Sequence, residues 1–181
     1  MALQTSGPIS FANLQSEFGG SNPITMGEYA AFRVSGSGNT ISMNQFYGAS
    51  SSETQTVTVG TYFDAGAYVQ STSWGFGLNL GGGFGSVSDG TLGVTGNSTL
   101  SLMTWNSLIP TVQLQVLGTV ANSGWTTMTV AGTAFTRASA TFSQNTTLTP
   151  YTTAWTWGDP NNPIANPYGT TVGATKQVVF T

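Results

Sequence analysis

The 181-residue sequence contains no cysteine and no histidine, and 5% of its residues are charged. An average soluble domain is about 25% charged. Without Cys or His, zinc sites built on those ligands and catalytic triads with a His or Cys member are excluded. The lack of cysteine also makes the stability of the fold independent of the redox compartment.

Positive charge is scarce: the basic residues are Arg33, Arg137 and Lys176, and the net charge is −3. A nucleic-acid partner requires several Lys or Arg contacts to phosphates, so we expect none. No apolar run approaches the ~20 residues of a membrane span. Because Met1 to Gln4 lacks the basic and apolar regions of a signal peptide, we expect a protein made in a cytoplasm and no membrane span.

Acid–base chemistry has few candidate residues. The carboxylates are Glu17, Glu28, Glu53, Asp64, Asp89 and Asp159. They show neither a paired-acid signature for glycoside hydrolysis nor an Asp-x-Asp-x-Asp spacing for calcium, and Asp159 before Pro160 is typical of a turn. We therefore expect no enzymatic activity, no catalytic residue, no cofactor and no metal.

Neutral polar residues take the place of charge: the chain has 20 Ser, 30 Thr, 12 Asn and 24 Gly, alongside 39% apolar residues. Thr, Val and the aromatic residues favour strands, so this composition predicts a β-rich domain with a hydroxyl and amide surface. A surface with so little charge promotes association. We therefore expect a homo-oligomer or a subunit of a larger assembly.

In the region 53–181, short segments in which apolar and polar residues alternate are separated by turn signals, as in a series of short strands. Period-two patterns or β-rich runs occur at 54–59, 112–116, 126–130, 140–142, 154–157 and 177–180. No amphipathic helix of 10–15 residues separates them, as a parallel sheet would require. The sequence therefore predicts about six to nine strands in an antiparallel, jelly-roll-like β-sandwich.

The region 1–50 instead has helix-start signals, and the chain divides near Ser50–Ser52. Ser10 precedes apolar residues spaced as one face of a helix, which Gly19 and Gly20 end. Two capping boxes follow, with Thr25 before Glu28 and Ser42 before Gln45. We expect a small anchoring module of short helices ahead of the mainly β domain.

A module of this size buries little apolar surface alone. We therefore predict that its large apolar side chains form an anchoring interface, either on the β domain or on another subunit. These residues are Phe11, Leu14, Phe18, Tyr29, Phe32, Phe46 and Tyr47.

A family resemblance rests on four stretches of this module. They are Gly7–Phe11, Leu14–Ile24 with Glu28–Tyr29, Ile41–Ser42 and Phe46–Gly48. Together they resemble a module of tailed-bacteriophage virion proteins, found in structural and fibre-type proteins of cyanophages and other aquatic phages. That family usually has a longer connector than Arg33 to Thr40. The resemblance implies a virion structural role and no catalytic residues.

The β region is similar to a domain of phage tail and fibre proteins. The similarity rests on short Gly-, Trp- and Thr-containing motifs at 75–96, 123–126, 130–138, 155–157 and 172–174. The two resemblances imply a protein of the virion, assembled in the host cytoplasm, with tail, baseplate or major capsid proteins as partners and a homotrimer by analogy. It would be a short tail fibre or adhesion protein, or else a capsid decoration (cement) protein; a soluble lectin is a third alternative.

The five tryptophans allow a carbohydrate-binding interpretation, because pyranose faces stack on exposed aromatic rings. Trp74, Trp105 and Trp125 are the candidate surface contacts for a host glycan; the alternative places each in the core or at a subunit interface, where Trp buries a large apolar area. The nine glycines from Gly75 to Gly96 lack a P-loop lysine and predict a flexible or tightly turning connection.

Overall fold

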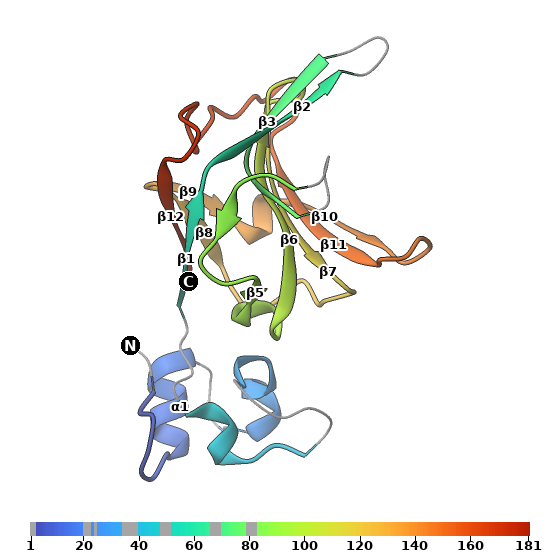
Figure 1. Cartoon of the computed structure of the whole chain (residues 1–181). Coiled ribbons are helices and arrows are strands. Elements are labelled where there is room, and N and C mark those ends of the chain that lie inside the picture. The colour runs from blue at the N-terminus through green and yellow to red at the C-terminus, as the bar shows by residue number, and fades with distance from the viewer. Residues whose placement is uncertain are drawn as a thin grey trace.

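The protein is described by a computed structural model that covers residues 3–19, 23, 25–33, 40–47, 52–65, 70–78 and 83–181. These residues are mainly β, with 43% of them in strands and 15% in helices, and two antiparallel sheets pack together as a β-sandwich. Short helices lie at one end of this sandwich, beside the C-terminus (Figure 1). The predicted fold class is confirmed.

The N-terminal helices are α1 (Phe11–Phe18) and the 3-10 helices η1 (Met26–Phe32) and η2 (Met43–Phe46). Ser10 caps α1 as predicted, because its hydroxyl accepts from the Asn13 N–H at 3.2 Å and the Asn13 amide oxygen accepts from the Ser10 N–H at 2.8 Å. Gln45 likewise accepts from the Ser42 N–H at 3.0 Å. Thr25 precedes η1 but its side chain makes no cap hydrogen bond within the described chain, so the first predicted capping box is wrong.

Two sheets form the sandwich. The smaller has the order β4-β1-β12-β8-β9, and the larger has the order β10-β11-β7-β6-β3-β2, with the short β5 paired to β6. The strands are β1 (Glu53–Thr58), β2 (Gly60–Ala65), β3 (Gln70–Gly77), β4 (Ser86–Val87), β5 (Thr91–Leu92), β6 (Ser98–Asn106), β7 (Thr111–Leu117), β8 (Thr127–Val130), β9 (Thr133–Thr136), β10 (Thr141–Asn145), β11 (Thr152–Trp157) and β12 (Thr175–Phe180). Each strand located in the sequence is present, but the predicted number of about six to nine is too low, because the described residues form twelve strands.

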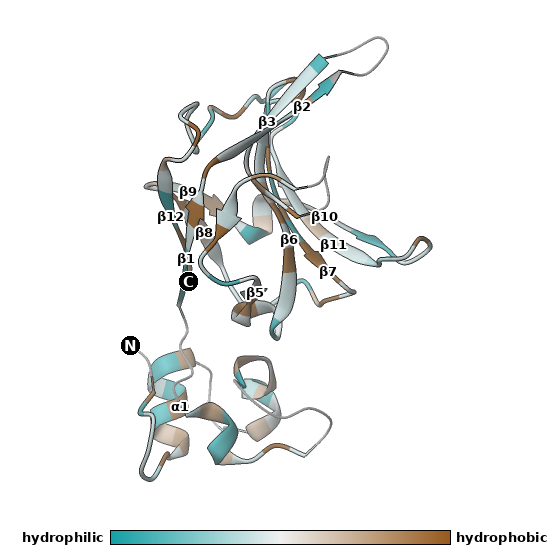
Figure 2. Cartoon of the chain, viewed as in Figure 1, coloured by the Kyte–Doolittle hydropathy of each residue, from teal (hydrophilic) through white to brown (hydrophobic). Residues whose placement is uncertain are grey.

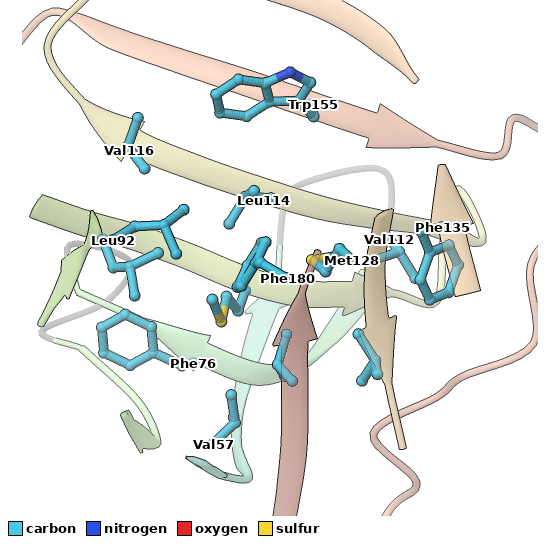
Figure 3. Close-up of a cluster of buried hydrophobic side chains, with 14 of the residues drawn as sticks. Val57, Phe76, Leu92, Val112, Leu114, Val116, Met128, Phe135, Trp155 and Phe180 are labelled. Carbon is cyan, nitrogen blue, oxygen red and sulfur yellow. The ribbon is translucent and has the colours of Figure 1, made fainter. Parts of the chain in front are cut away.

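The core lies between the sheets (Figure 3). Val57, Met128 and Phe180 from the smaller sheet face Leu114 and Trp155 from the larger one, and all five are fully buried. Figure 2 shows brown, hydrophobic segments on β6, β7 and β8 among paler, neutral ones. On β7 and β8 the burial alternates with the period-two pattern, which sends every second side chain into the core.

A buried glutamine joins β1 to the segment around β5. Gln55, 1% exposed, donates to the Thr91 carbonyl at 2.9 Å and accepts from the Asp89 N–H at 3.1 Å. A buried amide requires such partners, because leaving one unpaired costs about 1–3 kcal/mol. Gln55 therefore fixes the Asp89–Thr91 segment against the sandwich.

The glycine-rich region 75–96 differs from the predicted connection. Gly75 and Gly77 belong to β3, and the region also contains β4, β5 and the 3-10 helix η3 (Gly93–Thr95). Other residues named by the sequence patterns, Gly20, Ser50, Ser51, Gly81 and Gly82, lie outside the described residues.

Candidate functional site

The N-terminal module has a small core of its own. Leu14 and Phe46 are fully buried and Tyr29 is 1% exposed, and they pack together with Leu3. The Tyr29 hydroxyl donates to the Gly19 carbonyl at 3.0 Å, and burial, helped by the Glu28 charge, raises the pKa of this phenol. The three side chains are therefore interior residues rather than interface residues, because the short helices converge on them.

Two other predicted anchoring residues lie at the junction with the β-sandwich. Phe18 and Phe32 stack with ring centroids 4.3 Å apart and nearly parallel planes. With Trp125, Thr126 and Arg137 they line a pocket of about 220 Å³ between the module and the end of the smaller sheet. For these two residues the structure is consistent with the alternative in which the module packs on the β domain.

The remaining anchoring candidates lie at the surface of the module. Phe11, at the start of α1, is 41% exposed. Tyr47 is half-buried, and its hydroxyl donates to the Gly7 carbonyl at 2.6 Å. Phe11 is thus the member of the predicted set that offers most apolar surface to a partner.

The tryptophans lie mostly inside the sandwich. Trp125 is 3% exposed and its ring contacts Trp155 and Phe180 in edge-to-face geometry, each with centroids 5.6 Å apart. Its indole N–H finds no acceptor among the described residues. The prediction that Trp125 is a surface glycan contact is wrong, because its faces are covered by other rings.

Trp74 and Trp105 are half-buried neighbours on β3 and β6, directly opposite each other in register. The Trp105 N–H donates to the Ile164 carbonyl at 2.7 Å, which holds the 159–168 segment on the sandwich. Both rings also pack against the main core. Each therefore has a structural role, and neither is a freely exposed platform.

The Arg137 side chain binds backbone carbonyls near the junction between the N-terminal module and the β-sandwich. Its guanidinium donates to the carbonyls of Trp125 and Asn122, and its Nη1 also lies 3.1 Å from the Asn122 side-chain oxygen. The same oxygen accepts from the Trp155 N–H at 2.8 Å. The guanidinium is therefore an internal brace that fixes the segment before β8.

An open pocket with a volume of about 540 Å³ lies between β9 and the turn that follows β11. In that turn the Asp159 carboxylate accepts from the N–H groups of Asn161 and Asn162 at 2.7 and 3.0 Å. The Asn162 side-chain hydrogen bond, followed by these backbone bonds, lowers the pKa of Asp159. The sequence correctly predicts a turn here, but its spacing gives no sign that β9 lies beside it.

Two of the other carboxylates have local structural partners. Glu53 accepts from the Val94 N–H at 2.9 Å, and Asp89 accepts from the Thr91 N–H at 3.0 Å. In the part of the chain that the structure describes, no group of three or more Asp and Glu residues is placed to hold a metal ion.

Among the described residues, no helix is long and apolar enough to cross a bilayer. Comparison of the chain with models of known families, with curated proteins and with solved structures finds no match.

Proposed function

We propose that this protein is a non-enzymatic structural subunit of a tailed-phage virion. Its N-terminal module anchors it to other virion proteins, and its β-sandwich lies at the particle surface as a short tail-fibre or tail-associated adhesion protein. The observation that carries the proposal is the run Gly7–Tyr29, which resembles phage virion modules. In the structure, the described part of this run contributes to a separate small core.

The exposed apolar side chain of Phe11 supports an anchoring role for the module. It stands outside the core formed by Leu14, Tyr29 and Phe46, so it is accessible to another chain. Because Phe11 is 41% exposed, covering the rest of its ring contributes less than half of the about 1.5–3 kcal/mol that full burial of such a side chain gives. We infer that Phe11 is a contact between the module and the virion protein that carries it.

The arrangement of the sandwich supports a surface role. The hairpin of β2 and β3 extends away from the N-terminal helices (Figure 1), and Phe63 on β2 is 55% exposed. A protein that is anchored at one end and has an exposed apolar residue on a projecting hairpin can contact a second surface, such as that of the host, with the hairpin.

A capsid decoration protein is the second candidate, and one observation favours it. Exposed apolar residues occur at several separate turns of the sandwich, with Leu108 and Ile109 between β6 and β7 and Leu148 between β10 and β11. A subunit that lies flat on a shell and touches several neighbours would cover residues at more than one edge.

Immunogold labelling of intact particles tests both placements. We expect label on the tail if the adhesion role holds and on the head if the decoration role holds; label on neither contradicts the virion proposal. Particles whose chain carries Phe11→Ser should lose at least half of their label if Phe11 is a contact. Leu148→Ser, a matched change at a 71% exposed residue of the sandwich, is the control and should leave tail label unchanged.

A further inference from the structure

An open cleft forms where β9, the edge strand of the smaller sheet, lies beside the turn after β11. Its volume of about 540 Å³ is within the range of small-ligand sites, about 300–1,000 Å³. All four residues of β9 contribute to its wall. The other lining residues are Ser139, Trp157, Gly158, Asp159, Asn162 and Ile164.

Asp159 and Asn162 place an acceptor and an amide side by side in this cleft. One carboxylate oxygen of Asp159 accepts two backbone N–H groups, whereas the other, Oδ2, accepts from the Asn162 side chain at 3.2 Å. Asp159 and Asn162 also form a backbone bridge: the N–H of Asn162 donates to the Asp159 carbonyl and the N–H of Asp159 to the Asn162 carbonyl, with N···O distances of 3.1 and 3.2 Å. The pair is thus held in place before any ligand arrives, which lowers the entropy cost of binding.

Thr136 and Ser139 also line the cleft and carry hydroxyl groups. The Thr136 and Ser139 hydroxyl oxygens are 2.8 Å apart, and Ser139 donates to the Thr136 carbonyl at 2.9 Å. Because each hydroxyl oxygen has two lone pairs, both keep acceptor capacity. The half-buried Ile164 and the almost fully buried Phe135 add apolar surface.

The charge of the cleft selects against anions. Its described lining residues include Asp159 but neither Lys nor Arg. The lowered pKa of Asp159 keeps it ionised at neutral pH. The charge of Asp159 would therefore repel a phosphate or a carboxylate, and no basic residue of the described lining offsets this repulsion. A neutral ligand with hydrogen-bond donors is not repelled.

Strand addition to β9 is disfavoured at one end of the cleft. The Thr136 carbonyl already accepts from the Trp157 indole N–H at 2.7 Å and from the Ser139 hydroxyl at 2.9 Å. With both lone pairs used, this carbonyl has no capacity for the N–H of an added strand.

We propose that this cleft binds a neutral pyranose sugar through two adjacent hydroxyl groups. A sugar hydroxyl can both donate and accept a hydrogen bond. One sugar hydroxyl donates to Asp159 Oδ2, and the adjacent hydroxyl pairs with the side-chain amide of Asn162. The hydroxyl oxygens of Thr136 and Ser139 accept hydrogen bonds from other hydroxyls of the sugar. The proposal gives a ligand class to the adhesion role proposed above and depends on that role for its biological meaning.

The test is a titration of the full chain with methyl pyranosides of glucose, galactose and mannose, followed by NMR chemical-shift changes of the protein. We expect at least one of the three to bind with a Kd of about 1 mM, as suits one sugar in an open cleft. Asp159→Asn keeps an oxygen for the two backbone N–H groups but replaces the Oδ2 acceptor by a donor. We expect it to weaken binding at least tenfold.

Asp89→Asn is the matched control, because Asp89 also accepts a backbone N–H in an exposed turn but lies outside the cleft. It should leave binding unchanged, and both variants should keep the wild-type Tm. Absence of binding by all three pyranosides, equal binding by wild type and Asp159→Asn, or shifts that map away from residues 133–164 would each overturn the proposal. Because this test uses isolated protein, its failure would leave the virion-labelling result standing.

Discussion

At the level of single residues, three glycines of the β domain allow backbone segments to approach closely. The chain passes from β1 in one sheet to β2 in the other through a single residue, Val59, and Gly60 then pairs with Gly75 of β3. A Cβ atom on Gly60 would lie 2.1 Å from the backbone nitrogen of Gly85, and one on Gly75 would lie 2.1 Å from the Met103 carbonyl oxygen. Glycine is required there because three backbone segments meet without room for a side chain.

Gly60→Ala is therefore predicted to destabilise the protein by about 3 kcal/mol, since the added methyl group overlaps backbone that cannot rotate away. The measurement is a shift of the urea midpoint with unchanged m-value. Gly90→Ala is the control, because a Cβ at Gly90 has open space around it, and it should shift the midpoint little. Similar midpoints for the two variants would show that the backbone contact at Gly60 relaxes easily.

The glycines also show which contacts cannot be predicted from the sequence. Their density predicts a turning connection, and this is partly right, but Gly60 and Gly85 are far apart in the sequence and meet only in the folded chain. The same holds for Trp125: its position before a strand is visible in the sequence, whereas the rings of Trp155 and Phe180 that cover it come from β11 and β12.

At the level of elements, strands with one buried face are predicted well. β7 alternates strictly between buried and half-buried residues, and its period-two pattern marks it in the sequence. β6 is missed, because five successive residues, Leu100 to Thr104, are buried and the pattern has no alternation. β6 lies between β7 and β3 inside the larger sheet, and its buried run mixes the apolar Leu100, Leu102 and Met103 with the polar Ser101 and Thr104, so the sequence shows no clear period-two pattern there.

The helical caps give an element-scale prediction. Ser10→Ala removes the hydroxyl that accepts from the Asn13 N–H and should destabilise α1 by about 1 kcal/mol. Hydrogen exchange should therefore speed up in α1 by about fivefold, while β6 and β7 keep their protection, because the module has a core separate from that of the sandwich. Thr25→Ala, at an N-cap position without a side-chain hydrogen bond among the described residues, is the matched control and should change little. Equal acceleration in the strands would show that module and sandwich open as one unit.

At the level of the whole molecule, composition predicts the class of fold but not the location of a site. The β-rich, hydroxyl-bearing composition predicts a sandwich, and two packed antiparallel sheets confirm it. The cleft beside Asp159 depends on the pairing of β9 with β8 and of β11 with β7, which places segments about 25 residues apart along the chain on either side of one opening. The β8–β9 hairpin has a two-residue loop and is local in the sequence, whereas the β11–β7 pairing joins distant segments, and a single sequence carries no local signal of it.

The low charge of the chain predicts how its contacts in a particle respond to salt. Charged residues are 5% of the sequence, and the exposed apolar side chains of Phe11 and Phe63 are the surfaces we expect a neighbour to cover. Contacts of this kind bury few ions, so they avoid the several kcal/mol that each desolvated charge costs, and added salt has little charge to screen.

Release of the protein from particles, measured by sedimentation and immunoblot, should therefore change less than about twofold between ~0.05 M and ~0.5 M NaCl. A steep rise in release with salt would mean that the few charged residues, such as Glu17 and Arg33 in the module, carry the attachment, and that Phe11 is not its main contact.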